Sequence, residues 1–217
     1  MDAKILQTTM TNIINGVDMP RSETSMPCLD DPTKLLPTNR PITNIWSKDF
    51  IWCDGDVKKN IRAFWERIPK VNSGLLIHGI AGTGKTTIAV NIAREWKRKV
   101  PGAHIGGYDF FDILNAMKTF PERRDIKENA ILWNLQNNTF PNGLLIIDDF
   151  GAGRITEAAA DSIETLIRNW EKKGTNIIFT TNISPDKIME IFNEQLWSRI
   201  CGMTVQIEIT GRDWRVK

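Results

Sequence analysis

The feature that most constrains this chain is a glycine-rich segment, Gly79-Ile-Ala-Gly-Thr-Gly-Lys-Thr86, set between two apolar stretches. The preceding residues 74–78 predict a short buried strand, and residues 86–99 place Ile88, Ile92 and Trp96 at helical spacing. Glycine tolerates positive φ, so a turn of this composition can point successive backbone N–H groups at one ligand. The segment therefore predicts an anion cradle between a strand and a helix.

A nucleotide phosphate is the anion that this cradle is expected to hold. Lys85 supplies a positive charge for the β and γ phosphates, and Thr86 supplies a hydroxyl for Mg²⁺. The helix after the turn directs its positive end at the same anion. The expected cofactors are ATP and Mg²⁺, although these residues alone do not separate ATP from GTP. The residues expected to bind the nucleotide are Gly79, Ile80, Ala81, Gly82, Thr83, Gly84, Lys85, Thr86 and Thr87.

A pair of carboxylates follows an uninterrupted apolar run. Residues 144–147 predict a central parallel strand buried on both faces, and Asp148 and Asp149 come directly after it. Ligands bind at the carboxyl ends of parallel strands, so both carboxylates are expected to reach the phosphate site. Asp148 is the expected metal ligand together with Thr86, and Asp149 is expected to orient or deprotonate the attacking water. Lys85, Asp148 and Asp149 are therefore the first three residues predicted to be catalytic.

Two further polar residues follow later elements. Asn182 ends the apolar strand predicted over 176–180, where it could hydrogen-bond the γ-phosphate or the lytic water. Arg199 lies beyond the next predicted helix, 185–192. Its planar, permanently charged guanidinium is suited to stabilise a transferring phosphoryl group from a neighbouring subunit. The alternatives for Arg199 are an ordinary surface position or an ion pair with Glu194.

The rest of the chain alternates between strand-like and helix-like segments. Helices are predicted over 57–68, 109–120 and 158–170, and strands over 104–108 and 205–209. This alternation indicates an α/β fold with a mostly parallel sheet flanked by helices. Residues 122–138 carry only a weaker apolar stripe, through Ile126, Ile131, Leu132 and Leu135. The helix over 109–120 is expected to face inward with Phe111, Leu114, Met117 and Phe120.

Composition and charge narrow the class of protein. The 28 basic and 26 acidic residues give a net charge of +2, which is too balanced to diagnose or exclude nucleic-acid binding. Three isolated cysteines and two histidines fit neither a zinc knuckle nor a disulfide framework. No apolar run reaches the roughly 20 residues of a membrane span, and no signal-peptide pattern is present. A cytoplasmic protein without a membrane partner is expected.

Together these motifs resemble the DnaC/DnaI/IstB branch of AAA+ ATPases, which includes the replicative helicase loaders. The resemblance runs from residue 46 to residue 215 and depends on an ordered set: GIAGTGKTT at 79–87, LLIIDDFG at 144–151, IIFTTN at 177–182, LWSRI at 196–200 and GRDWR at 211–215. It implies a P-loop NTPase domain of the AAA+ type over 46–217. It also implies a role for each residue: Lys85 and Thr86 in Walker A, Asp148 and Asp149 in Walker B, Asn182 as sensor 1, and Arg199 as an arginine finger acting in trans.

Departures from the family pattern affect the expected activity and architecture. Asp149 stands where many AAA+ proteins carry glutamate, and its shorter side chain predicts slow hydrolysis, as suits a switch. The sequence given stops at Lys217, so the C-terminal lid is expected to be missing or minimal, and Arg215 is the candidate for a sensor 2. Residues 1–45, with recurrent prolines, are expected to form an arm that docks on a partner or a neighbouring subunit, or else a loosely ordered tail.

The resemblance implies an ATPase of DNA replication that forms a homo-oligomer on single-stranded DNA and delivers a replicative helicase, in a bacterial, phage or mobile-element setting. Hydrolysis of ATP to ADP and phosphate would be slow and stimulated by DNA. Alternatives that remain open are an IstB-like transposition regulator on duplex DNA, a P-loop small-molecule kinase, and a nucleotide-binding partner that never hydrolyses ATP. The residues considered for DNA contact are Arg94, Lys97, Arg98 and Lys99, then Lys118, Arg123, Arg124 and Lys127, with Phe110, Phe111 and Phe120 nearby.

Overall fold

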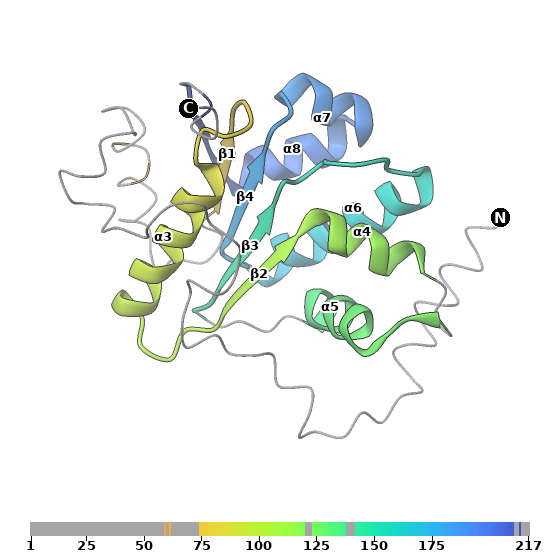
Figure 1. Ribbon diagram of the computed structural model, residues 1–217, viewed down its shortest axis with the longest axis horizontal. Helices are drawn as coiled ribbons and strands as arrows, with labels where there is room; N and C mark the ends of the chain where they lie inside the picture. The colour runs from red at the N-terminus through yellow and green to blue at the C-terminus, as the bar shows by residue number, and fades with distance from the viewer. Residues whose placement is uncertain are drawn as a thin grey trace.

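The computed structural model describes residues 59, 61, 74–119, 123–137, 142–210 and 213. Within these residues, one parallel sheet has the strand order β2-β3-β4-β1-β5. The strands are β1 (Gly74–His78), β2 (Ile105–Asp109), β3 (Leu144–Asp148), β4 (Ile177–Thr181) and β5 (Val205–Glu208). The helices are α3 (Lys85–Lys99), α4 (Phe110–Lys118), α5 (Ile126–Asn137), α6 (Glu157–Lys173), α7 (Pro185–Ile191) and α8 (Glu194–Met203). Figure 1 shows the helices flanking the sheet, so the predicted α/β fold is confirmed.

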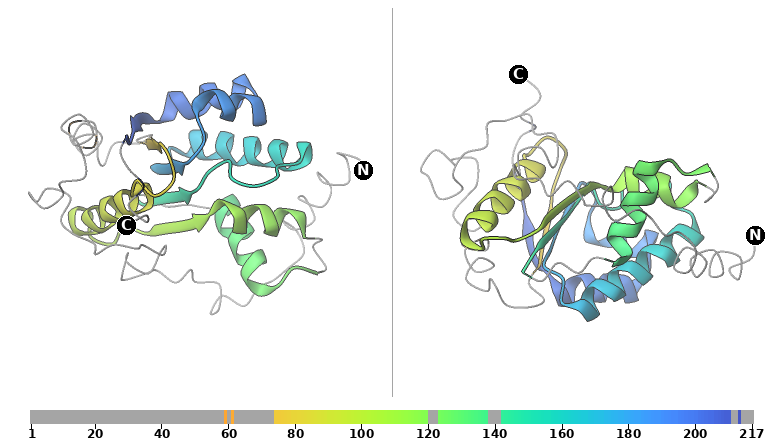
Figure 2. Two further views of the ribbon diagram at one scale, coloured as in Figure 1. Left: turned by 45° about the horizontal axis from the view of Figure 1, so that its top comes forward. Right: turned by 90° about the horizontal axis from the view of Figure 1, so that it is seen from below.

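The central strands are apolar along their whole length because both faces of the sheet are covered. In β3, Leu144 and Ile146 belong to the core beneath α3, while Leu145 and Ile147 belong to the core on the opposite face. Successive side chains of a strand point to opposite faces, which divides one apolar run between two cores. Figure 2 shows α3 on one side of the sheet and α6 and α8 on the other.

The strand order determines where the polar strand ends lie. Strand β4 pairs with both β1 and β3, and the strands run parallel in both pairs. Parallel strands direct their carboxyl ends to one edge of a sheet. The turn after β1, the carboxylates after β3 and the polar residues after β4 therefore meet at this edge.

Helix α4 faces the core through a different aromatic residue from the one expected. Phe110 is 1% exposed and Phe111 is 56% exposed, so the prediction that Phe111 points inward is wrong. The side chain of Asp109 caps the helix by accepting a hydrogen bond from Phe111 N at 2.7 Å, so the helix begins at Phe110. Leu114 is buried as expected, Met117 packs against the same core, and Phe120 lies outside the described residues.

Other differences from the expectations concern polar segments. The weak stripe over 122–138 contributes helix α5, with Ile131, Leu132 and Leu135 buried, but Ile126 is 82% exposed. Helix α8 was not predicted as an element; Asn193 caps it by accepting from Leu196 N at 2.8 Å. Of the helix expected over 57–68, only Lys59 and Ile61 are described, and both are helical. Residues 1–45 and Arg215 fall outside the described ranges.

None of the helices described in the structure combines the length and the apolar composition needed to cross a bilayer.

The adjacent phenylalanines of α4 provide a matched test of this orientation. Phe110 contacts the rings of Phe150 and Phe192 edge to face, with centroid separations of 5.0 and 6.4 Å. Phe110→Ala is expected to lower the free energy of unfolding by about 3–5 kcal/mol, because it leaves a cavity in the core. Phe111→Ala removes the same atoms from an exposed position and should change it by at most about 0.5 kcal/mol. Urea unfolding of both variants decides the point; similar losses would contradict the described facing of α4.

Candidate nucleotide-binding site

The turn between β1 and α3 has the backbone geometry of an anion cradle. Gly82 and Gly84 have φ values of 76° and 94°, in the left-handed region. Gly84 is also the N-cap of α3, so no side chain caps this helix, and its first turn contains no acidic residue. The leading N–H groups and the positive end of the helix dipole are thus available to an anion. This arrangement fits the nucleotide phosphates expected from the sequence.

The side chain of Lys85 is buried within the turn. Its ammonium donates hydrogen bonds to the carbonyls of Gly79 at 2.9 Å and Ile80 at 2.6 Å. Two backbone acceptors therefore hold the ammonium inside the turn that offers the N–H groups. This placement puts a full positive charge beside the candidate phosphate cradle, as the sequence predicts for Lys85.

The carboxylate of Asp148 connects three elements of the site. The Thr86 hydroxyl, at the start of α3, donates to both carboxylate oxygens, at 2.9 and 3.0 Å. The Thr180 hydroxyl, on β4, donates to Oδ1 as well. Asp148 is 7% exposed, and burial raises the pKa of its carboxyl while the two threonine hydrogen bonds oppose that rise. A buried carboxylate with an elevated pKa at a sheet edge is a suitable partner for a cation.

The oxygen atoms of Thr86 and Asp148 fit Mg²⁺ in kind and number. Mg²⁺ binds through one or two carboxylates, keeps several waters and takes phosphate oxygens as further ligands. Among the described residues, no group of three or more histidine, cysteine, aspartate or glutamate side chains could form a metal site of its own. Thr86 and Asp148 are therefore the residues that would hold Mg²⁺ beside a bound nucleotide.

Asp149 lies in a strained turn immediately beyond Asp148. Its φ is 52°, a left-handed conformation that aspartate tolerates better than most residues. Its backbone N–H donates to Thr180 Oγ1 at 3.0 Å, and its carboxylate accepts a hydrogen bond from Asn182 Nδ2 at 2.6 Å. The structure thus brings Asp149 and Asn182 into direct contact. Roles in orienting water remain predictions for both residues.

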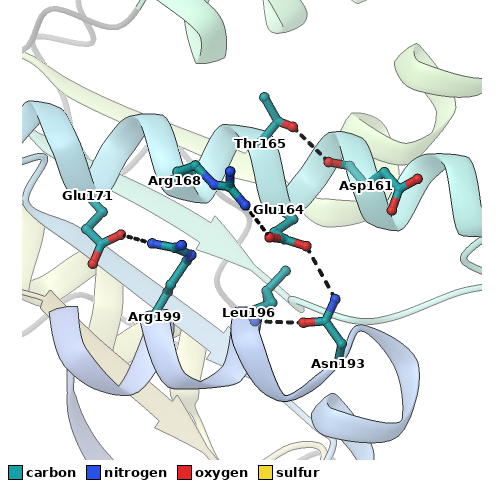
Figure 3. Close-up of polar contacts among 8 residues, drawn as sticks. All are labelled: Asp161, Glu164, Thr165, Arg168, Glu171, Asn193, Leu196 and Arg199. Atoms are coloured by element: carbon teal, nitrogen blue, oxygen red, sulfur yellow. Dashed lines mark hydrogen bonds and ion pairs between the residues drawn. The ribbon is translucent and has the colours of Figure 1, made fainter. Parts of the chain in front are cut away.

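Arg199 lies apart from these residues, between α8 and α6. Its Nη1 donates to Glu171 Oε2 at 2.6 Å, as Figure 3 shows, so its partner is Glu171 and the alternative pairing with Glu194 is wrong. Within the described part of the chain it makes no hydrogen bond or ion pair with Lys85 or the Asp148–Asp149 pair. Its role as an arginine finger is therefore still a prediction.

Two contributors to the site were not identified from the sequence. Thr180 is fully buried and contacts the side chain of Asp148 and the backbone of Asp149. The only signal for it was that the strand over 176–180 ends in small polar residues. Asp213, in the GRDWR segment, lies against the phosphate turn, because a Cβ placed on Gly82 would be 1.7 Å from its Oδ1. Long-range packing of this kind leaves no mark in the local sequence.

Comparisons with known proteins bear on the family and the fold of the chain. The model of the ATPase family associated with various cellular activities (AAA) matches residues 75–203. The crystal structure of the DnaC helicase loader is 25% identical, with a TM-score of 0.60 over 71% of this chain and 89% of that chain. The DnaI structure is 20% identical, with a TM-score of 0.62 over 76% and 90%. A replication initiator DnaA bound to AMPPCP and single-stranded DNA is 18% identical, with a TM-score of 0.59 over 80% and 52%. The last two likenesses show the fold alone, and no curated protein matches the chain.

Gly82 and Gly102 allow the phosphate turn to be tested against a matched glycine. Both have positive φ, 76° and 78°, but a Cβ at Gly102 meets no atom within 4 Å. Alanine at either position should lower stability by about 1–2 kcal/mol through backbone strain. Only Gly82→Ala also forces Asp213 away and disturbs the cradle, so it alone should weaken binding of a fluorescent ATP analogue, by at least about tenfold. Equal affinities for the two variants would contradict the placement of the cradle.

The raised pKa of Asp148 predicts a pH-dependent stability difference. Between the ordinary aspartate pKa and the raised folded value, the folded chain keeps a proton that the unfolded chain has released, so stability falls as pH rises. Above this window, nucleotide-free Asp148→Asn should be more stable than the wild type by about 0.5–2 kcal/mol, although it loses Mg²⁺-dependent hydrolysis. The difference should disappear at lower pH.

Urea unfolding across a pH series, without nucleotide or Mg²⁺, measures this effect. Asp161→Asn, which alters an exposed carboxylate of α6, is the control and should leave stability unchanged. A destabilised Asp148→Asn variant at high pH would show that the hydrogen-bonded carboxylate favours the fold when ionised.

Proposed function

We propose a function for this chain from one premise: it belongs to the AAA family of ATPases. Membership gives it nucleotide binding and ATPase activity in general terms, and its fold is like those of DnaC and DnaI. The proposed function is that of a helicase loader. The chain would form a homo-oligomer on single-stranded DNA, hydrolyse ATP between neighbouring subunits and deliver a replicative helicase.

The observation that carries the proposal is the separation of Arg199 from the rest of the site. One copy of the chain joins Thr86 to Asp148 and Asp149 to Asn182 by hydrogen bonds. Arg199 instead pairs with Glu171, on the surface between α6 and α8. A guanidinium that stabilises charge on a transferring phosphoryl group has to come near it. A second copy of the chain would supply this group, which supports an oligomer with sites between subunits.

Each residue of the site would have a separate task in hydrolysis. Lys85 and the N–H groups of the turn would bind the phosphates, and Mg²⁺, held by Thr86 and Asp148, would neutralise charge on them. Asp149 and Asn182 are hydrogen-bonded to each other, so the amide would fix the carboxylate that orients the attacking water. The aspartate side chain is one methylene shorter than glutamate, which favours slow turnover.

The proposed DNA-contacting surface is formed by the exposed faces of α4 and α5, which pack against each other. Phe111 is exposed on α4 and Trp133 on α5, and exposed aromatic rings can stack on unpaired bases. Lys118 and Lys127 are exposed on the same two helices and could contact phosphates.

Two residues considered for DNA contact have structural positions instead. Phe110 is in the core, and the Nε of the half-buried Arg124 donates to the carbonyls of Ala116 and Thr119. The basic residues of α3, Arg94, Lys97, Arg98 and Lys99, remain candidates; Arg98 is paired with Glu95.

A mixing experiment tests the trans arginine. Arg199→Ala should lower kcat at least about 100-fold without weakening ATP binding, whereas Lys85→Ala should abolish binding. In an equimolar mixture, Lys85→Ala subunits would supply Arg199 to the intact sites of Arg199→Ala subunits, so activity should return. Arg168→Ala, which removes a neighbouring arginine of α6 that pairs with Glu164, is the matched control and should keep wild-type turnover.

The same hydrolysis measurements distinguish the alternatives. Stimulation by single-stranded DNA more than by duplex DNA, with nucleotide-dependent oligomers, is expected for the loader. Preference for duplex DNA would favour an IstB-like regulator. A strictly monomeric protein whose activity ignores Arg199 and DNA would overturn the proposal and favour a kinase.

A further inference from the structure

The guanidinium of Arg199 is held at one point only. Its Nη1 donates to Glu171 Oε2 at 2.6 Å, and its Nε is buried without a hydrogen-bond partner. No other hydrogen bond or ion pair of Arg199 occurs in the described part of the chain. An arginine has five N–H donors in a rigid plane, so most of its donor capacity is unused in one copy of the chain.

Glu171 is the carboxylate that remains for Arg199 on this surface. Glu164, seven residues earlier on α6, is also nearby, but its two oxygens accept from Arg168 Nη2 at 2.7 Å and from Asn193 Nδ2 at 3.3 Å. Figure 3 shows the two acidic residues apart along α6, with Glu171 beside Arg199 and Glu164 beside Arg168 and Asn193. The two pairs are therefore distinct, and Glu171 belongs to Arg199.

Fold stability gives little reason for the Glu171–Arg199 pair. The two side chains are 32% exposed for Arg199 and 37% exposed for Glu171. Ion pairs at such exposed positions contribute little to stability, since water and salt screen them and two long side chains must be ordered. The pair does restrict the rotamers of Arg199, however, because one end of its plane is anchored and the Nε is enclosed.

We propose that Glu171 is a positioning residue, which holds Arg199 in the orientation in which a neighbouring subunit's nucleotide site receives it. The inference rests on the proposed function, since it requires that Arg199 acts in trans. An arginine side chain loses considerable rotamer freedom when it is fixed, and small misplacements of a catalytic group lower rates strongly. An anchored guanidinium enters the neighbouring site already oriented, with the remaining donors for the transferring phosphoryl group.

The test extends the mixture of Lys85→Ala subunits, which donate Arg199, with Arg199→Ala subunits, which provide the nucleotide site. Glu171→Ala is introduced into one partner at a time. In the donor it should lower the recovered kcat about tenfold with KM unchanged, because the donated arginine is no longer oriented. In the acceptor it should have no effect, since that subunit has no arginine to orient. If Glu171 served folding or assembly instead, its substitution would lower the rate in the donor and in the acceptor alike.

Three controls complete the design. Asp161→Ala in the donor removes a carboxylate of the same helix that accepts no hydrogen bond from the described residues, and should leave the recovered kcat unchanged. Glu171→Gln in the donor should recover much of the rate, because its amide oxygen can still accept from Nη1. Thermal unfolding of every variant checks that each subunit folds.

The outcomes are separable. A loss confined to the donor supports the inference. The inference would be overturned if Glu171→Ala lowered the rate equally in donor and acceptor, had no effect, or raised the rate in the donor. None of these results would contradict the proposal that Arg199 acts in trans. If the parent mixture regains no activity, the trans arginine fails, and the positioning role of Glu171 fails with it.

Discussion

The site depends on one buried charge, the carboxylate of Asp148. It lies at the end of a central strand that is buried on both faces, and hydroxyls from α3 and β4 donate to it. A buried carboxylate is tolerated only when hydrogen bonds or a cation offset the loss of hydration. Thr86 and Thr180 provide hydrogen bonds to the carboxylate. These bonds offset only part of the cost of burial, since the pKa of Asp148 is still raised. The carboxylate is thus prepared for a cation, and the two threonines hold the phosphate turn and β4 in register around it.

Parallel strand order extends this constraint to the neighbouring residues. Because β4 lies between β3 and β1, Thr180 can contact the side chain of Asp148 and the backbone of Asp149 together. The backbone then reverses in a left-handed turn at Asp149, and its carboxylate meets Asn182. Phe150 follows at once and packs among Phe110, Phe179 and Phe192. The aromatic core therefore fixes the turn that carries the polar residues.

The sequence located those parts of the site that depend on local chain chemistry. Glycine spacing and apolar runs placed the phosphate turn and both carboxylates, since backbone conformation and burial on two faces leave direct marks in composition. The facing of α4 was predicted wrongly because periodicity could not choose between the adjacent Phe110 and Phe111. The contact of Arg199 with Glu171, distant in sequence, depends on how α6 packs against α8. No local pattern encodes such a contact.

Under the proposed function, ATP binding and ATP hydrolysis have different structural requirements. The groups that fit phosphate and Mg²⁺ all come from one copy of the chain, around the edge of its own sheet. The arginine is held elsewhere, by an ion pair that is partly exposed. Such a pair adds little to the stability of the fold, but its geometry would restrict the guanidinium. Under the proposed function, a single subunit could bind ATP, but turnover would require a neighbour. The rate of hydrolysis would then report assembly, which is the behaviour that a loader needs in order to act once it is in place.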